Sequence, residues 1–210
     1  MEFTVNKFST FTIINFNDHE PGSHISYIVG YPDGEFKPDE NVTRAQLALM
    51  IARNLGYSNQ AATSGVPFED VPSAHYALNA IAFVKERGIM QGDPDGSFRA
   101  DDSITRAEMA AVVSNYLKLS PAEGSAEQFS DTNGHWAHAI INAAYASGAI
   151  QGYPDGSFRP DRNLTRAEAV TLINHMFNRG PLHGVERDVF PDVHDSHWAY
   201  GHILEAALDH

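Results

Sequence analysis

The chain contains no cysteine among its 210 residues, which excludes disulfide bonds, thiolate catalysis and metal sites held by cysteine. Basic residues are scarce, because 14 Lys and Arg stand against 27 Asp and Glu, giving a formal net charge of −13. Nucleic acids and anionic membranes need a basic footprint on their binder, so neither is an expected partner. No apolar run approaches the roughly 20 residues that cross a bilayer. The first residues lack the basic and apolar regions of a signal peptide, so we expect an exported form to come from a longer precursor.

What the chain does contain is one pattern repeated three times. GYPDGEFKPDENVTRAQ begins at Gly30, GDPDGSFRADDSITRAE at Gly92 and GYPDGSFRPDRNLTRAE at Gly152. A second string alternates with it and reads FEDVPSAHYA, FSDTNGHWA and FPDVHDSHWA in turn. Cutting before each of the three glycines divides the chain into units 30–91, 92–151 and 152–210.

Each unit predicts a loop, a helix, a connector and a second helix. Pro-Asp-Gly is typical of turns, and we expect the phenylalanine two residues later to plug the loop into the core. The Thr-Arg-Ala-Glu or Thr-Arg-Ala-Gln that follows, ahead of apolar residues at helical spacing, predicts a capping box. The second helices are expected to begin near the HYA and HWA segments, with Ser73, Asn133 and Ser196 as N-caps.

Helix pairs of about 60 residues cannot each bury a core alone, so the units must pack on one another. A closed ring and an open solenoid both satisfy this, and we favour the ring because no unit is specialised as a cap. The predicted fold is therefore mostly α, with three loop-helix-connector-helix repeats forming a single pseudo-threefold domain over residues 25–210. Residues 1–24 form a lead segment, strand-like over 7–17, that either ends an upstream domain or packs on the first unit.

An arginine follows the capping threonine of each unit, at Arg44, Arg106 and Arg166. A cation there opposes the helix dipole at a cost of a few tenths to about 1 kcal/mol. Breaking that rule three times indicates a functional or specially compensated position. The functional interpretation is a pocket for a carboxylate or phosphate, shared between helix amides and guanidinium. The alternative is an internal ion pair with the loop aspartates, such as Asp95 and Asp155, or with the aspartates of the F-x-D segments.

Two further sets of residues, each at one position that recurs in all three units, bear on function; we call such a set a column. Tyr76, Trp136 and Trp198 are either stacking surfaces for a sugar or core anchors of the second helices. The capping position is Gln46 in the first unit but glutamate in the others, which argues against acid–base catalysis because a proton-transfer residue must titrate. With no nucleophile motif and no phosphate-binding loop, we expect no enzyme.

Metal sites find little support in the sequence. His194, His197 and His202 fit no common ligand spacing, and the aspartates of the second loop have the wrong offsets for an EF-hand. We therefore expect neither a metal site nor a cofactor.

The GYPDGSF loops, TRAE boxes and F-x-D…HWA segments, each present three times in fixed order, resemble the S-layer homology domain over residues 28–210. This resemblance implies a helical spindle with a central bundle and grooves between neighbouring repeats. It also implies an extracellular role at the bacterial cell surface, where the domain anchors a surface protein non-covalently to a secondary cell wall polymer through pyruvylated N-acetylmannosamine. The binding arginine of the family falls on Arg44, Arg106 and Arg166.

The expected ligand-binding set joins these arginines with the aromatic column, the repeat-opening glycines and two loop aspartates. Its members are Arg44, Arg106, Arg166, Gly30, Gly92, Gly152, Asp95, Asp155, Tyr76, Trp136 and Trp198. By the phasing of the family the chain starts within a repeat, so we expect the last helix to close the ring beside the first unit. Substitutions such as Asp93 for tyrosine leave open which groove keeps its function.

Three classes of function are weighed. The first is binding of the wall polymer, with an upstream domain of the same precursor as a further candidate partner. The second is a structural protein–protein interaction module that binds no carbohydrate. The third, which we rank far behind, is a hydrolase that acts on wall glycan with carboxylates from two grooves.

Overall fold

The computed structural model describes residues 24–57, 67–121, 127–185 and 189–210. The lead segment expected over residues 1–24, strand-like over 7–17, lies outside these ranges, apart from His24. Six helices occur in the described part of the chain: α1 (Arg44–Asn54), α2 (Leu78–Glu86), α3 (Arg106–Tyr116), α4 (His138–Ala146), α5 (Arg166–Met176) and α6 (Tyr200–Ala207). The mostly helical prediction is confirmed.

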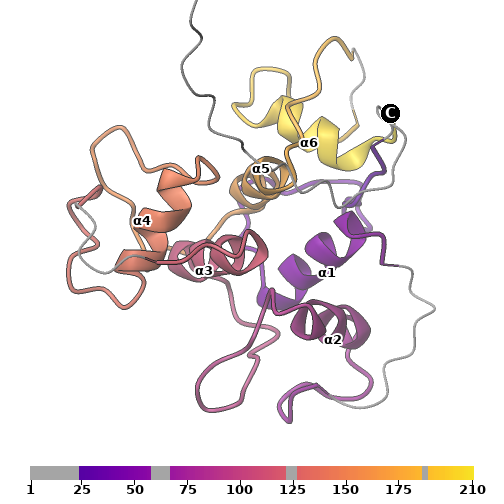
Figure 1. Cartoon of the computed structure of the whole chain (residues 1–210). Helices are drawn as coiled ribbons and strands as arrows, with labels where there is room; N and C mark the ends of the chain where they lie inside the picture. Colours follow the sequence, from indigo (N-terminus) through magenta and orange to yellow (C-terminus); the bar gives the residue numbers. More distant parts are fainter. Residues whose placement is uncertain (1–23, 58–66, 122–126, 186–188) are drawn as a thin grey trace, which may run out of the picture.

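The helices form three pairs arranged around a common centre (Figure 1). In each pair the two helices of one repeat pack together, α1 with α2, α3 with α4 and α5 with α6. The first helix of each pair lies toward the centre and the second lies outside it (Figure 1). This is the pseudo-threefold arrangement that the repeats predicted.

At the centre, three backbone hydrogen bonds form a closed cycle. Val42 N–H donates to the carbonyl of Leu164, Leu164 N–H to that of Ile104, and Ile104 N–H to that of Val42, over 2.9, 2.9 and 3.0 Å. The side chains of all three residues are fully buried. Because each repeat bonds to the next and the third returns to the first, the repeats form a ring and not an open solenoid.

All three predicted capping boxes are present. The threonine side chain accepts from the backbone of the fourth residue, whose own side chain accepts from the threonine N–H. The backbone amides of the first two residues of each central helix donate hydrogen bonds to carbonyls of the next repeat. For α1, Arg44 N–H donates to the carbonyl of Asp102 and Ala45 N–H to that of Ala100, both over 2.9 Å. The equivalent amides of α3 and α5 bond the third and first loops in the same way.

Each loop contacts the preceding repeat through a pair of phenylalanine rings and through hydrogen bonds to an aspartate. The loop phenylalanines Phe36, Phe98 and Phe158 are buried, as expected, and each packs against the phenylalanine of a preceding F-x-D segment at ring-centroid distances of 5.0–5.3 Å. The F-x-D aspartate accepts from two successive loop amides. Asp192 of the last repeat accepts from Phe36 and Lys37 of the first, over 2.8 and 2.7 Å.

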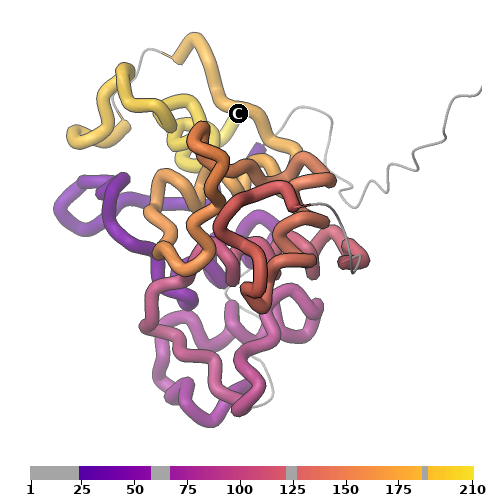
Figure 2. The backbone as a smooth tube through the Cα atoms, turned by 90° about the vertical axis from the view of Figure 1, so that its left-hand side faces the viewer, coloured from indigo at the N-terminus to yellow at the C-terminus, as the bar shows by residue number. Residues whose placement is uncertain are grey.

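The ring is also closed by a segment before the first loop. Tyr27 and Ile28 N–H donate to the carbonyl of Ala206 at the end of α6, and the buried Tyr27 hydroxyl donates to Asn174 of α5 over 2.6 Å. In the side view the yellow C-terminal repeat lies next to the indigo start of the described chain (Figure 2). The prediction that the last helix closes the ring beside the first repeat is confirmed.

The predicted starts of the second helices are wrong by a few residues. α2, α4 and α6 have Ala77, Ala137 and Ala199 as N-caps, with no side-chain hydrogen bond at the cap. The residues expected as caps precede a turn that spans the His-Tyr or His-Trp pair. In that turn the histidine Nδ1 accepts from the alanine N–H, 3.2 Å away for His75 and Ala77. Residue types alone did not distinguish this turn from a helical start.

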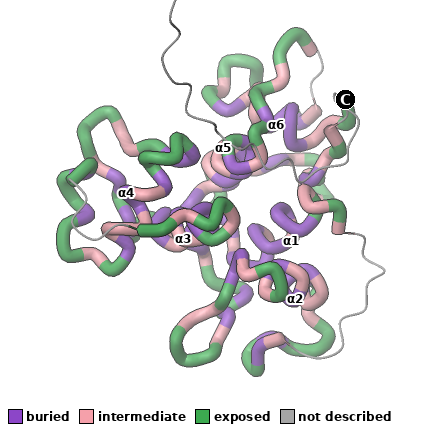
Figure 3. Tube along the Cα trace, viewed as in Figure 1, coloured by how far each residue is buried: buried purple, intermediate pink, exposed green. Residues whose placement is uncertain are grey.

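Buried residues gather along α1, α3 and α5, whereas the outer loops are mainly exposed (Figure 3). Among the described residues, no helix is both long enough and apolar enough to cross a membrane.

Candidate functional site

The three arginines of the TRAE column each cross into the loop of the next repeat. Their Nε donates to the carbonyl of the loop phenylalanine: Arg44 to Phe98 over 2.6 Å, Arg106 to Phe158 over 2.7 Å and Arg166 to Phe36 over 2.8 Å. All three arginines are buried, at 5–7% exposure. Each guanidinium therefore lies at the boundary between two repeats. We call each of these three boundaries a groove and name it after the repeat whose loop receives the arginine.

The expected sharing of the anion with helix amides is wrong. The first two amides of each central helix donate to carbonyls of the next repeat, and the third donates to the capping threonine. The internal ion pair that was the alternative is also wrong in its partners. Among the described residues, neither the loop aspartates nor the F-x-D aspartates form an ion pair with these arginines. Within the described part of the chain, Arg44 alone of the three has a carboxylate partner, Glu108 at 3.1 Å.

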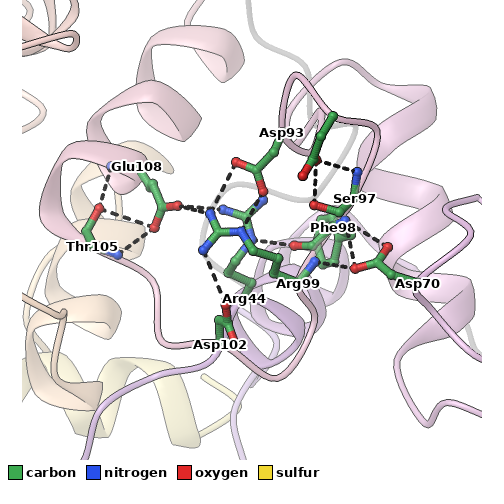
Figure 4. Close-up of polar contacts among 10 residues, drawn as sticks. Arg44, Asp70, Asp93, Ser97, Phe98, Arg99, Asp102, Thr105 and Glu108 are labelled. Atoms are coloured by element: carbon green, nitrogen blue, oxygen red, sulfur yellow. Dashed lines mark hydrogen bonds and ion pairs between the residues drawn. The ribbon is translucent and has the colours of Figure 1, made fainter.

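The second-repeat groove is filled by an ion-pair network (Figure 4). Glu108 Oε1 accepts from both Arg44, at 3.1 Å, and Arg99, at 2.8 Å. Arg99 also holds Asp93, at 2.7 Å, and Asp102, at 3.3 Å. These hydrogen bonds raise the pKa of Arg99. Two arginines face three carboxylates, so the charge of the groove is −1 and its donors are already engaged.

The third-repeat groove contains an open cavity of about 420 Å³, in the size range of small-ligand sites. Its lining residues are Asp39, Tyr153, Arg159, Arg162, Thr165, Glu168 and Trp198. Beneath it, the guanidinium of Arg106 lies 4.7 Å from the centroid of the Tyr153 ring. Burial lowers the pKa of Arg106, as it does that of Arg166.

Trp198 is the only lining residue that belonged to the expected ligand-binding set, and Arg162 is the most informative of those that the set missed. Glu40 and Asp102 occupy the same position in the other repeats, so Arg162 belongs to no repeated column. The sequence did offer a signal for Arg162, because this position is basic in the third repeat and acidic in the other two. Arg162 Nη1 lies 2.6 Å from Glu168 Oε1 and also donates to the Tyr153 hydroxyl, which bonds Glu168 at 3.0 Å.

The first-repeat groove is intermediate in charge. Arg166 stacks over Tyr31 at 4.8 Å, and Lys37 lies over the same ring at 4.8 Å. Among the positions of the first groove that correspond to the charged positions of the other two, Glu40 is the only acidic residue, because Gln46 stands where the others have glutamate. Over these equivalent positions the formal charges are +1 in the first groove, −1 in the second and, with three arginines against Glu168, +2 in the third. Asp39, contributed by another repeat, also lines the third cavity and lowers the charge there to +1.

The aromatic column is exposed, so the core-anchor interpretation is wrong. Tyr76, Trp136 and Trp198 are 62%, 62% and 63% exposed. Each stacks against its preceding histidine at 4.6–5.7 Å between ring centroids. Two of these histidines also contact an aspartate: His75 lies 3.4 Å from Asp101, and His135 lies 3.2 Å from Asp161. Trp198 lines the third-repeat cavity, and Tyr76 hydrogen-bonds Thr43 in the first repeat.

The repeat-opening glycines have a packing role. A Cβ at Gly30, Gly92 or Gly152 would come within 2.1–2.7 Å of a ring carbon of the preceding phenylalanine. Asp95 and Asp155 accept from the serine two residues later, over 2.9 and 3.0 Å, and so shape the loop turn. Hydrogen bonds from the Ser157 hydroxyl, the Ser157 amide and Arg159 lower the pKa of Asp155 to about 2. A contact between any of these residues and a ligand stays a prediction.

A second cavity, lined by Glu69, Asp70 and Asp95 among others, carries three carboxylates and no cation in its lining. It is therefore unsuited to an anionic ligand.

The family model of the S-layer homology domain matches residues 27–48, 67–110 and 128–170, just over half of the chain. The chain is 43% identical over 200 residues to cell surface glycoprotein 1 of Acetivibrio thermocellus, covering 90% of this chain and 9% of that protein. It is also 43% identical over 195 residues to the cellulosome-anchoring protein of the same bacterium, covering 90% and 43%. An uncharacterized cell wall amidase of Bacillus anthracis is 37% identical over 148 residues, covering 69% and 27%. The chain thus spans less than half of each of these relatives.

Proposed function

Because this chain belongs to the S-layer homology family, we propose that it anchors a surface protein non-covalently to the bacterial cell wall. The bound partner is a secondary cell wall polymer, held through the carboxylate of its pyruvylated N-acetylmannosamine. The names of two relatives, a cell surface glycoprotein and a cellulosome-anchoring protein, support the location and the anchoring role. The role is non-enzymatic; the relative named as an amidase extends well beyond the part that matches this chain.

The observation that carries the proposal is the third-repeat cavity. It places two arginines, a tyrosine hydroxyl and an exposed tryptophan around one space, with a third, buried arginine beneath the tyrosine ring. Guanidinium groups suit a carboxylate because they donate in a planar fork. An aromatic face beside polar groups suits the apolar face of a sugar ring. Pyruvylated N-acetylmannosamine presents both chemistries on one residue.

The current partners of the two lining arginines can be exchanged for a ligand carboxylate. Arg159 pairs with Asp155 at 2.8 Å, but both side chains are about half exposed, so this pair contributes little to stability. Arg162 pairs with Glu168, which retains its hydrogen bond from the Thr165 amide at 3.0 Å when the arginine turns toward a ligand. We therefore rank the third groove first, the first groove second and the acidic second groove last.

Two tryptophan variants test this ranking with a matched control. Trp198→Ala and Trp136→Ala remove the same side chain, equally exposed, from equivalent positions of the third and second repeats. We expect Trp198→Ala to weaken cosedimentation with purified wall sacculi at least tenfold and Trp136→Ala to change it less than threefold. Equal effects of the two variants would contradict the ranking of the grooves.

A charge reversal tests the anion directly. Arg162→Asp restores an acidic residue of the kind found at Glu40 and Asp102, and we expect it to abolish measurable binding to sacculi. Lys118→Asp, at an exposed residue outside the grooves, makes the same change in net charge and should leave binding intact. If both variants lose binding equally, net charge and not the groove controls recognition.

Sacculi stripped of pyruvate identify the ligand chemistry. We expect their binding to fall to background, and unchanged binding would refute recognition of the pyruvyl carboxylate. Association of the protein with itself or with other surface proteins in the absence of wall carbohydrate, measured by light scattering, would favour a protein–protein interaction module instead.

A further inference from the structure

Two histidines and a glutamate converge where the described chain begins and ends. His24 Nδ1 lies 2.7 Å from Glu205 Oε1, and His210 Nε2 lies 2.9 Å from Glu205 Oε2. One ligand atom from each residue lies within 4.8 Å of the others. Among the residues that the structure describes, no other group of three or more His, Asp and Glu gathers in this way. The groove residues play no part in the cluster.

The two histidines are placed by the backbone. His24 and His210 each donate their N–H to the carbonyl of the other, as a hydrogen-bonded pair does in an antiparallel ladder. In such a pair both side chains project from the same face. Their rings meet edge to face, with centroids 5.1 Å apart. The imidazoles are therefore held together by main-chain bonds and do not depend on each other for their position.

Glu205 is held equally firmly from α6. Its side chain is only 3% exposed, and Arg179 Nε donates to Oε1 over 2.7 Å. Arg179 also donates to the carbonyl of Ile25 and to Asn54 Oδ1, so its own position is fixed. An outer hydrogen bond that orients a ligating carboxylate is a common feature of metal sites. In this cluster the hydrogen bond from Arg179 orients Oε1 of Glu205, and Oε2 of Glu205 faces His210.

The strongest sign of a missing partner is the buried Nδ1 of His24. This atom makes no hydrogen bond with the described residues, although Glu205 Oε1 is only 2.7 Å away. The nitrogen and the carboxylate oxygen lie close together but are not aligned for a hydrogen bond. Two ligand atoms that bind the same metal ion are placed in this way. A buried polar atom without a partner is costly, and metal coordination removes that cost.

We propose that His24, Glu205 and His210 bind a divalent transition metal of the zinc class. Imidazole and carboxylate are ligands that zinc accepts at about 2.0–2.2 Å, so tetrahedral ligand atoms lie about 3.4 Å apart. The observed spacing reaches this value through small rotations of the imidazoles. With three protein ligands, the fourth position is taken by water. The metal joins the segment that enters the first repeat to the helix that ends the last, and so locks the ring. This proposal does not rest on wall binding.

Zinc titration of chelator-treated protein by calorimetry tests the site. We expect one equivalent of Zn²⁺ to bind, and a hundredfold excess of zinc over its Kd to raise the unfolding midpoint by several degrees. The double variant His24→Gln/His210→Gln should bind at least tenfold more weakly and lose the thermal shift. The control His183→Gln/His194→Gln removes two exposed imidazoles elsewhere and should behave as the unsubstituted chain.

The proposal is overturned if the unsubstituted chain takes up no zinc, or if the His24/His210 variant binds it as tightly. Circular dichroism shows whether that variant folds. If it does not, Co²⁺ bound to the unsubstituted chain decides the matter. A four-coordinate site of nitrogen and oxygen ligands gives strong visible absorption bands, and an octahedral, aqua-like spectrum would refute the site.

Discussion

Replacing Arg106 by alanine is expected to loosen the junction between the second and third repeats before it affects any ligand. The side chain is buried, and its Nε and Nη2 donate to the carbonyls of Phe158 and Gln151 over 2.7 and 3.0 Å. Alanine leaves both carbonyls without these donors. Its cost therefore falls on the folded ring itself, because Phe158 belongs to the third repeat and Gln151 is the residue directly before that repeat.

The magnitude follows from these contacts. The buried acceptor left without its donor, the carbonyl of Phe158, costs about 1–3 kcal/mol, and the carbonyl of the exposed Gln151 costs less because water can replace the lost donor. Loss of the guanidinium above the Phe158 and Tyr153 rings, both 4.7 Å away, adds about 1–2 kcal/mol. Removing a buried cation recovers part of its desolvation, which is the same effect that lowers the pKa of Arg106. The net expectation is a loss of about 2–4 kcal/mol in the free energy of unfolding.

Urea unfolding followed by far-UV circular dichroism measures this loss. Arg87→Ala is the matched control, because Arg87 is exposed and lies over the ring of Phe83 on its own helix, and it should cost less than about 1 kcal/mol. Arg106→Lys should recover less than half of the loss, since one ammonium cannot reproduce the planar fork. A loss below about 1 kcal/mol for Arg106→Ala would refute the structural role of the column.

Two further predictions concern packing and pH. Gly152→Ala places a Cβ 2.1 Å from a ring carbon of Phe129 and should destabilise the fold by about 1–3 kcal/mol in the same urea assay, whereas Gly180→Ala, with open space around it, should not. Burial alone would raise the pKa of Glu168, but hydrogen bonds from Thr165 and Arg162 outweigh it and lower that pKa. Its stabilising contribution is therefore present above the ordinary value near 4.5 and lost as the pH falls through the lower folded value, so Glu168→Gln should destabilise the protein at pH 7 and progressively less below about pH 4. An unchanged difference in unfolding free energy from pH 7 to pH 3 would contradict this assignment.

The sequence by itself determined the repeats, the turns and the first helix of each pair. These depend on contacts between residues two to four positions apart, such as the capping boxes, which need only the right residue types at the right spacing. The same local reasoning failed at the second helices, where Ser73 and its counterparts were expected to cap. There a histidine side chain bonds the backbone two residues on and delays the helix.

Only the tertiary structure decided what the arginine column contacts and how the grooves differ. Arg106 and the carbonyl of Phe158 are 52 residues apart, and they meet because the ring brings each helix start onto the next loop. The three grooves share a backbone arrangement, so their charges depend on residues such as Arg162 that differ between the repeats, and only the structure shows that this position lines the cavity. His24 and His210 are separated by nearly the whole chain, and only ring closure brings them to Glu205. Local spacing fixes local structure, whereas the partners of buried charges are fixed by which distant segments the closed ring brings together.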